Sequence, residues 1–145
     1  SKIHLIISNS SASAKSARLT VLGAATDAAR ELAPIDLPAR SVSVQSAADL
    51  GLTEPSGVIV EVDGGEVAVE QRLSGGTGAD AAPCSNEPAA QAFFPSLNTQ
   101  RGNSARIWLM NPFPADASVD MEVASTDGVR SEERRVGKEC RSRWS

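Results

Sequence analysis

Alternation of apolar and polar side chains is the feature of this sequence that most limits its fold. Apolar residues recur at every second position from Val58 to Val62 and again from Val67 to Leu73, with Gln71 as the exception. A period of two places one set of side chains on one face of a β-strand. Asp63-Gly64-Gly65 separates the two runs and supplies residues that tolerate positive φ. The pattern predicts a β-hairpin over residues 58–73.

Shorter stretches with the same period precede this hairpin. Residues 3–7 and 17–21 alternate on either side of a Ser/Ala-rich loop, which predicts a strand pair in the form of a second hairpin. Residues 35–44 predict a further short strand region. Residues 24–32 are predicted as a loop with at most one helical turn, because their apolar side chains are too small to form a helix face. Residues 74–88 are predicted as a Gly/Ala/Pro-rich loop.

A stretch near the C-terminal end resembles the N-terminal strand pair. Leu5 to Asn9 aligns with Ile107 to Asn111 at an offset of 102 residues. At the same offset and without a gap, three apolar residues fall on three others: Ala17, Leu19 and Val21 on Val119, Met121 and Val123. We interpret residues 105–124 as strand, Asn-Pro corner and strand, and the chain as a tandem repeat. A period near 100 residues is typical of immunoglobulin-like sandwiches.

The predicted fold class is therefore all-β, with an immunoglobulin-like β-sandwich over residues 1–100. Residues 101–129 are expected to form the first hairpin of a second, incomplete sandwich. The chain has no Tyr and only 3% aromatic residues, so the core must be built from small and β-branched side chains.

The last sixteen residues, 130–145, differ from the rest in composition. They resemble, residue for residue, the translation of a common short-read sequencing adapter, and we expect them to be a non-native tail. The alternative is a basic segment for nucleic acid or membrane, since they hold six of the 14 Lys and Arg residues. Without them, 8 Lys and Arg stand against 15 Asp and Glu, a net charge of −7, which disfavours a nucleic-acid partner. No apolar run is long enough to span a bilayer, so any membrane anchor is expected outside this fragment.

Residues with catalytic potential are few and badly placed for chemistry. His4 is the only His and lies in the middle of a predicted strand, and Cys84 is the only Cys before the tail. We therefore predict no catalytic residue, no cofactor and no metal site. A hydrolase that uses Glu61 and Glu70 on the outer face of the predicted hairpin is a minor alternative. Asn9-Ser10-Ser11 also fits the N-glycosylation pattern, which is a weak signal.

The four aromatic residues before the tail cluster within 21 positions of one another. We expect Phe93, Phe94, Trp108 and Phe113 to be buried between the two sandwiches. If they are exposed instead, Trp108, Phe113 and Phe93 form a candidate platform for sugar rings, which gives a carbohydrate-binding module as the alternative function.

Several short motifs occur in a fixed order along the chain: residues 67–71 (VAVEQ), 83–85 (PCS), 92–95 (AFFP), Gly102, 109–114 (LMNPFP), 119–120 (VD) and 127–128 (DG). Together they resemble the actinobacterial DUF5719 family of cell-envelope proteins. The resemblance implies tandem β-sandwiches and an extracytoplasmic location, in the envelope or secreted, and it supplies no catalytic residue. We therefore expect a non-catalytic module with a structural or interaction role, whose partners are envelope proteins or cell-wall glycan.

Overall fold

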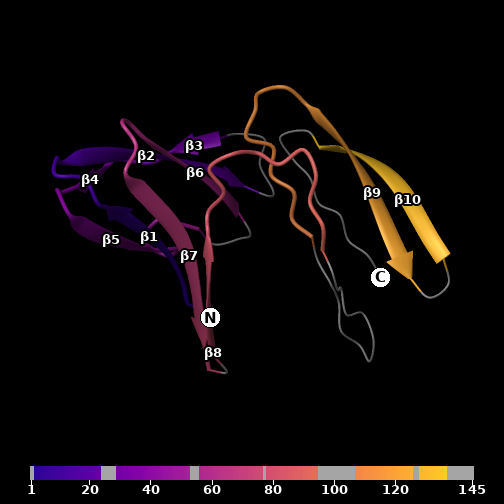
Figure 1. Cartoon of the computed structure of the whole chain (residues 1–145), viewed down its shortest axis with the longest axis horizontal. Helices are drawn as coiled ribbons and strands as arrows, with labels where there is room; N and C mark the ends of the chain where they lie inside the picture. The colour runs from indigo at the N-terminus through magenta and orange to yellow at the C-terminus, as the bar shows by residue number, and fades with distance from the viewer. Residues whose placement is uncertain are drawn as a thin grey trace.

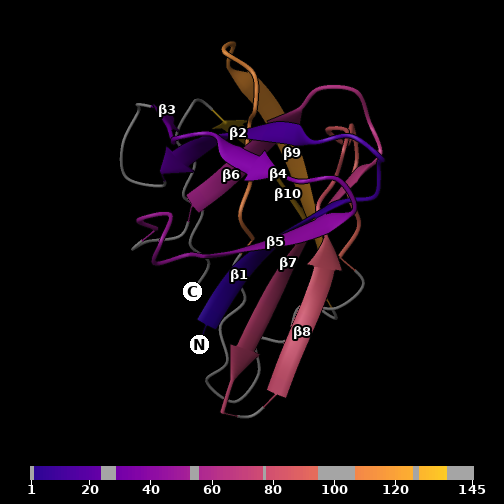
Figure 2. The same cartoon turned by 90° about the vertical axis from the view of Figure 1, so that its left-hand side faces the viewer.

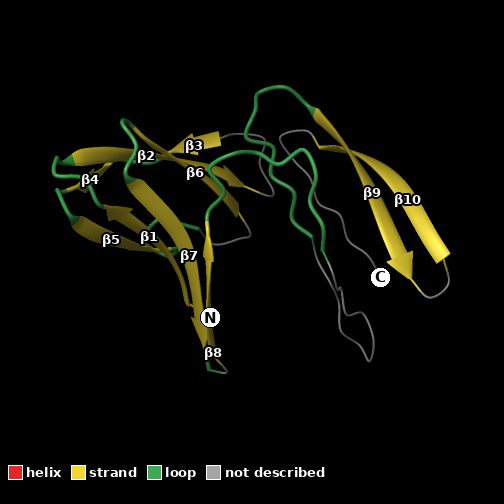
Figure 3. Cartoon of the chain, in the orientation of Figure 1, coloured by secondary structure: helices red, strands yellow, loops and turns green. Residues whose placement is uncertain are grey.

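The computed structural model describes residues 2–23, 29–52, 56–76, 78–94, 107–125 and 128–136. Within these residues the regular secondary structure consists of strands alone (Figure 3). The strands are β1 (Lys2–Asn9), β2 (Lys15–Gly23), β3 (Ala29–Glu31), β4 (Ile35–Leu37), β5 (Ser41–Ser46), β6 (Ser56–Val62), β7 (Val67–Gly75), β8 (Gly78–Pro83), β9 (Ala117–Ser125) and β10 (Gly128–Val136). The all-β prediction is confirmed.

The first eight strands form two antiparallel sheets (Figures 1 and 2). One sheet has the order β5-β1-β7-β8. In the other, β2 pairs with β6 along one edge, while β3 and β4 pair with successive parts of its other edge. Each sheet thus has one long central strand from the N-terminal stretch of the chain, β1 or β2.

Three segments of the chain cross from one sheet to the other at the same place. β1 continues into β2 through residues 10–14, β4 into β5 through residues 38–40, and β6 into β7 through residues 63–66. The pairing follows them across, since β7 pairs with β1 and β6 pairs with β2. The sandwich is therefore a three-stranded antiparallel ribbon folded over on itself, and we call the three connecting segments the corner.

Both predicted hairpins are wrong in their pairing, although their strands are real. β6 and β7 lie in different sheets and do not pair with each other, and the same holds for β1 and β2. The positive φ values expected at the turn are present, at 83° for Gly64 and 62° for Gly65. A local pattern of strand, turn and strand is the same for a hairpin and for a folded ribbon, because only the partner strands distinguish them.

Side chains that point between the sheets form one core. Its fully buried members come from both sheets and from the turn after β5, namely Ile7, Ala17, Leu19, Leu37 and Leu50. Half-buried residues of the predicted alternating runs, such as Val60 and Val69, pack around them. The β-sandwich prediction is confirmed. The immunoglobulin-like strand order is not, because β1 and β2 lie in opposite sheets, whereas the first two strands of that fold share one.

Two of the predicted loops contain strands. β8 lies within residues 74–88 and pairs with β7, from Gly75 opposite Gly78 to Glu70 opposite Pro83. β3 lies within residues 24–32, of which residues 24–28 are outside the described part of the chain. Both strands are poor in β-branched residues and occupy sheet edges. They form because the neighbouring strand offers unpaired backbone groups, which a composition-based prediction does not register.

The C-terminal part differs from its predicted form. Residues 107–116 have no strand assignment, and β9 pairs with β10 rather than with the residues that precede it. The predicted boundary at residue 100 lies outside the described residues. The predicted start of the tail at residue 130 falls within β10, so the backbone pairing continues across it. The adapter origin of residues 130–145 stays a prediction.

Candidate functional site

The side chain of Asn9 is the centre of the corner. Asn9 ends β1 and is 2% exposed. Its Nδ2 donates to the carbonyl oxygens of Ser13, Leu37 and Pro38 at 2.9, 3.1 and 2.9 Å. Its Oδ1 accepts hydrogen bonds from the backbone N–H and the hydroxyl of Ser11 at 3.1 and 2.7 Å. One amide thus joins two of the three segments of the corner.

Other polar contacts connect the third segment to the same place. The backbone N–H and the hydroxyl of Ser10 donate to the carbonyl oxygen of Glu66, at 3.0 and 2.9 Å. Lys15 Nζ donates to the carbonyl oxygens of Asp63 and Gly64 at 3.2 and 3.1 Å. Among the described residues, no buried side-chain nitrogen or oxygen lacks a hydrogen-bond partner. The buried amide of Asn9 therefore joins two segments of the corner, and exposed hydrogen bonds from Ser10 and Lys15 attach the third.

The turn that begins at Asn111 repeats the local part of this arrangement. Asn111 Nδ2 donates to the carbonyl oxygen of Ala115 at 2.6 Å, and Asn111 Oδ1 accepts from the backbone N–H of Phe113 at 3.1 Å. These partners are four and two residues ahead, as Ser13 and Ser11 are for Asn9. The strand that follows also corresponds, because Lys15–Gly23 shifted by 102 residues gives the bounds of β9, Ala117–Ser125.

Asn9 is unsuitable as a glycosylation acceptor in this fold. Its Nδ2 is the atom to which a glycan would be attached, and it is buried with three carbonyl oxygens around it. The structural role of the Asn9 side chain was not predicted from the sequence. The recurrence of Asn at positions 9 and 111 within the offset alignment is the signal that points to that role.

The carboxylates of the hydrolase hypothesis are not brought together. Glu61 is on β6, opposite Arg18 of β2, whereas Glu70 is on β7, opposite Ile6 of β1. Both are exposed, and they belong to different sheets. A pair of carboxylates that flanks one glycosidic bond must lie within about 10 Å across a shared cleft. The separation of β6 and β7 removes the common face on which the hypothesis depended.

The predicted burial of the aromatic cluster is wrong for the described residues. Phe93 is 81% exposed, Phe113 57%, Phe94 56% and Trp108 50%. Trp108 and Phe113 flank the Asn111 turn, and no strand of the described part of the chain pairs with their segment. The rings are therefore available to a ligand or a partner, as the carbohydrate-binding alternative requires.

Met110 connects this segment to the sandwich. A Cβ atom placed on Gly57 of β6 would overlap the Sδ atom of Met110, so the thioether lies directly against the Gly57 backbone. Gly57 has an ordinary strand conformation and is not needed for a turn. Its missing side chain instead provides the space in which Met110 sits.

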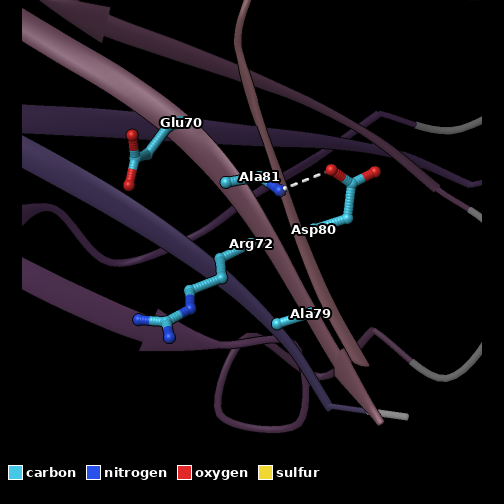
Figure 4. Close-up of a pocket in the computed structure, with 5 residues that line it drawn as sticks. All are labelled: Glu70, Arg72, Ala79, Asp80 and Ala81. Atoms are coloured by element: carbon cyan, nitrogen blue, oxygen red, sulfur yellow. Dashed lines mark hydrogen bonds between the residues drawn. The ribbon is translucent and has the colours of Figure 1, made fainter. Parts of the chain in front are cut away.

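A shallow hollow lies on the outer face of β7 and β8 (Figure 4). Glu70 and Arg72 point to one side of the strands, and Asp80 points to the other and accepts a hydrogen bond from the Ala81 N–H at 2.9 Å. The remaining lining residues are Ala79 and Ala81. The lining thus carries one cation, Arg72, and two carboxylates, Glu70 and Asp80, on an open surface.

The remaining titratable candidates are isolated. His4 is half-buried in β1, opposite Ser46 and Arg72. Cys84 follows β8 as a free thiol, and its backbone N–H donates to the carbonyl oxygen of Val69. Cys84 is exposed, but partial desolvation by neighbouring groups raises the pKa of its thiol, and the charge of Glu70 raises it further. The described residues contain no group of three His, Cys, Asp or Glu side chains that could hold a metal ion. They also contain no helix that could cross a membrane.

The fold and the corner define an all-β sandwich protein in which three segments share one asparagine-centred turn. A sequence profile of DUF5719, a family of unknown function, matches residues 1–135, and the chain belongs to this family. The resemblance found from the short motifs is thus confirmed. No curated protein and no solved structure matches the chain.

Proposed function

We propose that this chain is a non-catalytic β-sandwich module of an extracytoplasmic cell-envelope protein, with a structural or interaction role. The observation that carries the proposal is the use of its buried polar side chains. Asn9 and Ser11 are the buried polar residues of the described chain, and both are engaged in the corner. Buried polar groups that are fully paired within the protein rigidify a fold, which supports a structural role.

The same geometry supports a tandem arrangement. Asn111 repeats two hydrogen bonds of Asn9, and β9 repeats the bounds of β2. We propose that residues from about 105 onward open a second sandwich of the same design. The partners of the chain would be envelope proteins or cell-wall glycan.

Cell fractionation tests the location and the role together. In an actinobacterium that carries this family member, antibodies against the chain should detect it in the envelope fraction, and external protease should remove it from intact cells. The purified chain should show no hydrolysis of cell-wall glycan. Detection in the cytosolic fraction, or glycan hydrolysis that depends on Glu70, would refute the proposal.

The exposed rings favour glycan binding as a second candidate function. Trp108, Phe113 and Phe93 present flat apolar faces to solvent, and such faces stack on sugar rings. Trp144→Phe leaves Trp108 as the only Trp, because the chain has two. Its fluorescence should then shift to shorter wavelength when soluble cell-wall glycan fragments are added. The shift should disappear in Phe113→Ala, and a Trp108 signal that never responds to glycan would remove this candidate.

A further inference from the structure

Among the described residues, no strand pairs with the edge of β9 that faces away from β10, whereas the corresponding edge of β2 in the first sandwich is paired. β2 is flanked on both edges, by β3 and β4 on one side and by β6 on the other. β9 has the same nine-residue length as β2 and pairs, within the described chain, with β10 alone. Leu32 follows β3, which lies on the edge of β2 opposite β6, and its N–H donates to the Leu19 carbonyl. Backbone groups alternate between the two edges of a strand, so the odd-numbered residues of β2 direct theirs away from β6 and the even-numbered residues direct theirs toward it.

The backbone groups on the free edge follow from the β9–β10 register. Ser125 lies opposite Gly128 across a two-residue connection, so this pair exchanges hydrogen bonds and every second pair does the same. Ser118, Asp120, Glu122 and Ala124 therefore direct their N–H and C=O groups to the free edge. Unpaired strand edges are templates for a further strand.

The side chains of β9 define the chemistry of that strand. Val119, Met121 and Val123 are half-buried on one face, while Asp120 and Glu122 are exposed on the other. In the first sandwich, the position equivalent to Asp120 is Arg18, which lies opposite Glu61 of β6 and is 3.9 Å from Asp63. The sign of the charge at this position is reversed in β9. A strand that pairs there would complement it with basic residues.

We propose that the free edge of β9 binds an extended partner segment that is apolar on one face and basic on the other. The segment lies antiparallel to β9, in the register that β6 has with β2. Its apolar side chains lie opposite Val119, Met121 and Val123, and its basic side chains lie opposite Asp120 and Glu122. Backbone hydrogen bonds supply the affinity and the two charged pairs supply the selectivity. The inference rests on the tandem arrangement proposed above and adds the chemistry of the partner.

Two blocked, dye-labelled peptides test this with the full chain. One copies the seven residues of β6, Ser56–Val62, and the other differs from it by Ile59→Lys and Glu61→Lys. In fluorescence anisotropy titrations, the lysine peptide should bind roughly fivefold more tightly, because two opposite-charge pairs replace one like-charge pair and one neutral pair. Added salt should reduce this difference. Equal affinities for the two peptides would overturn the proposed selectivity.

Variants of Asp120 locate the binding site on β9. Asp120→Pro removes one N–H from the free edge and should weaken binding of the lysine peptide at least tenfold, whereas Asp120→Asn keeps the N–H and should weaken it about threefold. Ser118→Pro, near the start of the strand, is a second test if Asp120→Pro disturbs the hairpin. Unchanged peptide binding in both proline variants would refute the site.

Analytical ultracentrifugation tests whether a second copy of the chain is the occupant. A dimer that is lost in both proline variants would identify a second copy and overturn the basic partner. Failure of the cell-fractionation test leaves these titrations unaffected, so the two proposals fail separately.

Discussion

Asn9 and Asn111 lie 102 residues apart and make the same two local hydrogen bonds, one to a carbonyl four residues ahead and one from an N–H two residues ahead. Within the part of the chain that the structure describes, Asn9 alone adds bonds to a distant segment, at Leu37 and Pro38. The local turn is thus shared by both sites, whereas the long-range part belongs to the complete sandwich. The difference between the two sites can be measured as stability.

Asn9→Ala should destabilise the protein by about 2–4 kcal/mol, because several carbonyl and hydroxyl groups of the corner lose their partner while buried. Urea unfolding monitored by circular dichroism measures the change as a lower midpoint with an unchanged slope. Asn111→Ala is the matched control and should cost less than about 1 kcal/mol, since its hydrogen bonds are exposed. Equal effects of the two substitutions would contradict a special role of Asn9.

Glu66→Gly should stabilise the protein by about 0.5–1 kcal/mol, because Glu66 has a φ of 57°, which disfavours a residue with a Cβ atom. The hydrogen bonds from Ser10 are made to the Glu66 carbonyl and survive the substitution. Thermal unfolding measures the change. Gly64→Ala, at a φ of 83° and with its new Cβ 3.1 Å from Lys15 Nζ, should shift the midpoint in the opposite direction. A lower midpoint for Glu66→Gly would show that its side chain matters more than its backbone strain.

Gly57→Ala should displace Met110 from β6 rather than disrupt the strand, since the Cβ would meet the flexible end of that side chain. We expect a loss of about 0.5–1 kcal/mol in the natural sequence and almost none in a Met110→Ala background. A double-mutant cycle by urea unfolding measures this coupling. Additive effects of the two substitutions would show that the contact contributes nothing to stability.

The thiol of Cys84 should react slowly with iodoacetamide at pH 8, compared with a cysteine in a short peptide, because its raised pKa leaves less thiolate. Glu70→Gln removes the second cause of the shift and should accelerate the reaction. The sign for stability follows from the same shift. The pKa of the thiol in the folded chain lies above its ordinary value of 9.0. Its contribution to the stability of the fold is therefore fully present below about pH 9 and is lost as the pH rises through the folded pKa. An alkylation rate that Glu70→Gln leaves unchanged would argue against its charge as a cause.

Local patterns along the chain are sufficient to locate most of the strands and to predict an all-β fold. Alternation over residues 58–62 and 67–73 is a local property, and it sets which side chains can face a core. The positive φ values at Gly64 and Gly65 were predictable for the same reason, since they depend on the residue type. The recurrence of Asn at positions 9 and 111 was also visible in the sequence, but the hydrogen bonds that the two side chains make were not predictable from it.

Strand pairing, by contrast, depends on contacts between distant parts of the chain. Strand, glycine turn and strand describe a hairpin and a folded ribbon equally well, and the choice depends on hydrogen bonds between segments far apart in the chain. Asn9 acquires its role because Leu37 and Pro38 reach it from 28 and 29 residues away. Trp108 and Phe113 are exposed because no strand among the described residues pairs with their segment, which no local pattern encodes. Pairing and burial are properties of the assembled sheets, and they follow from long-range contacts that a period of two does not specify.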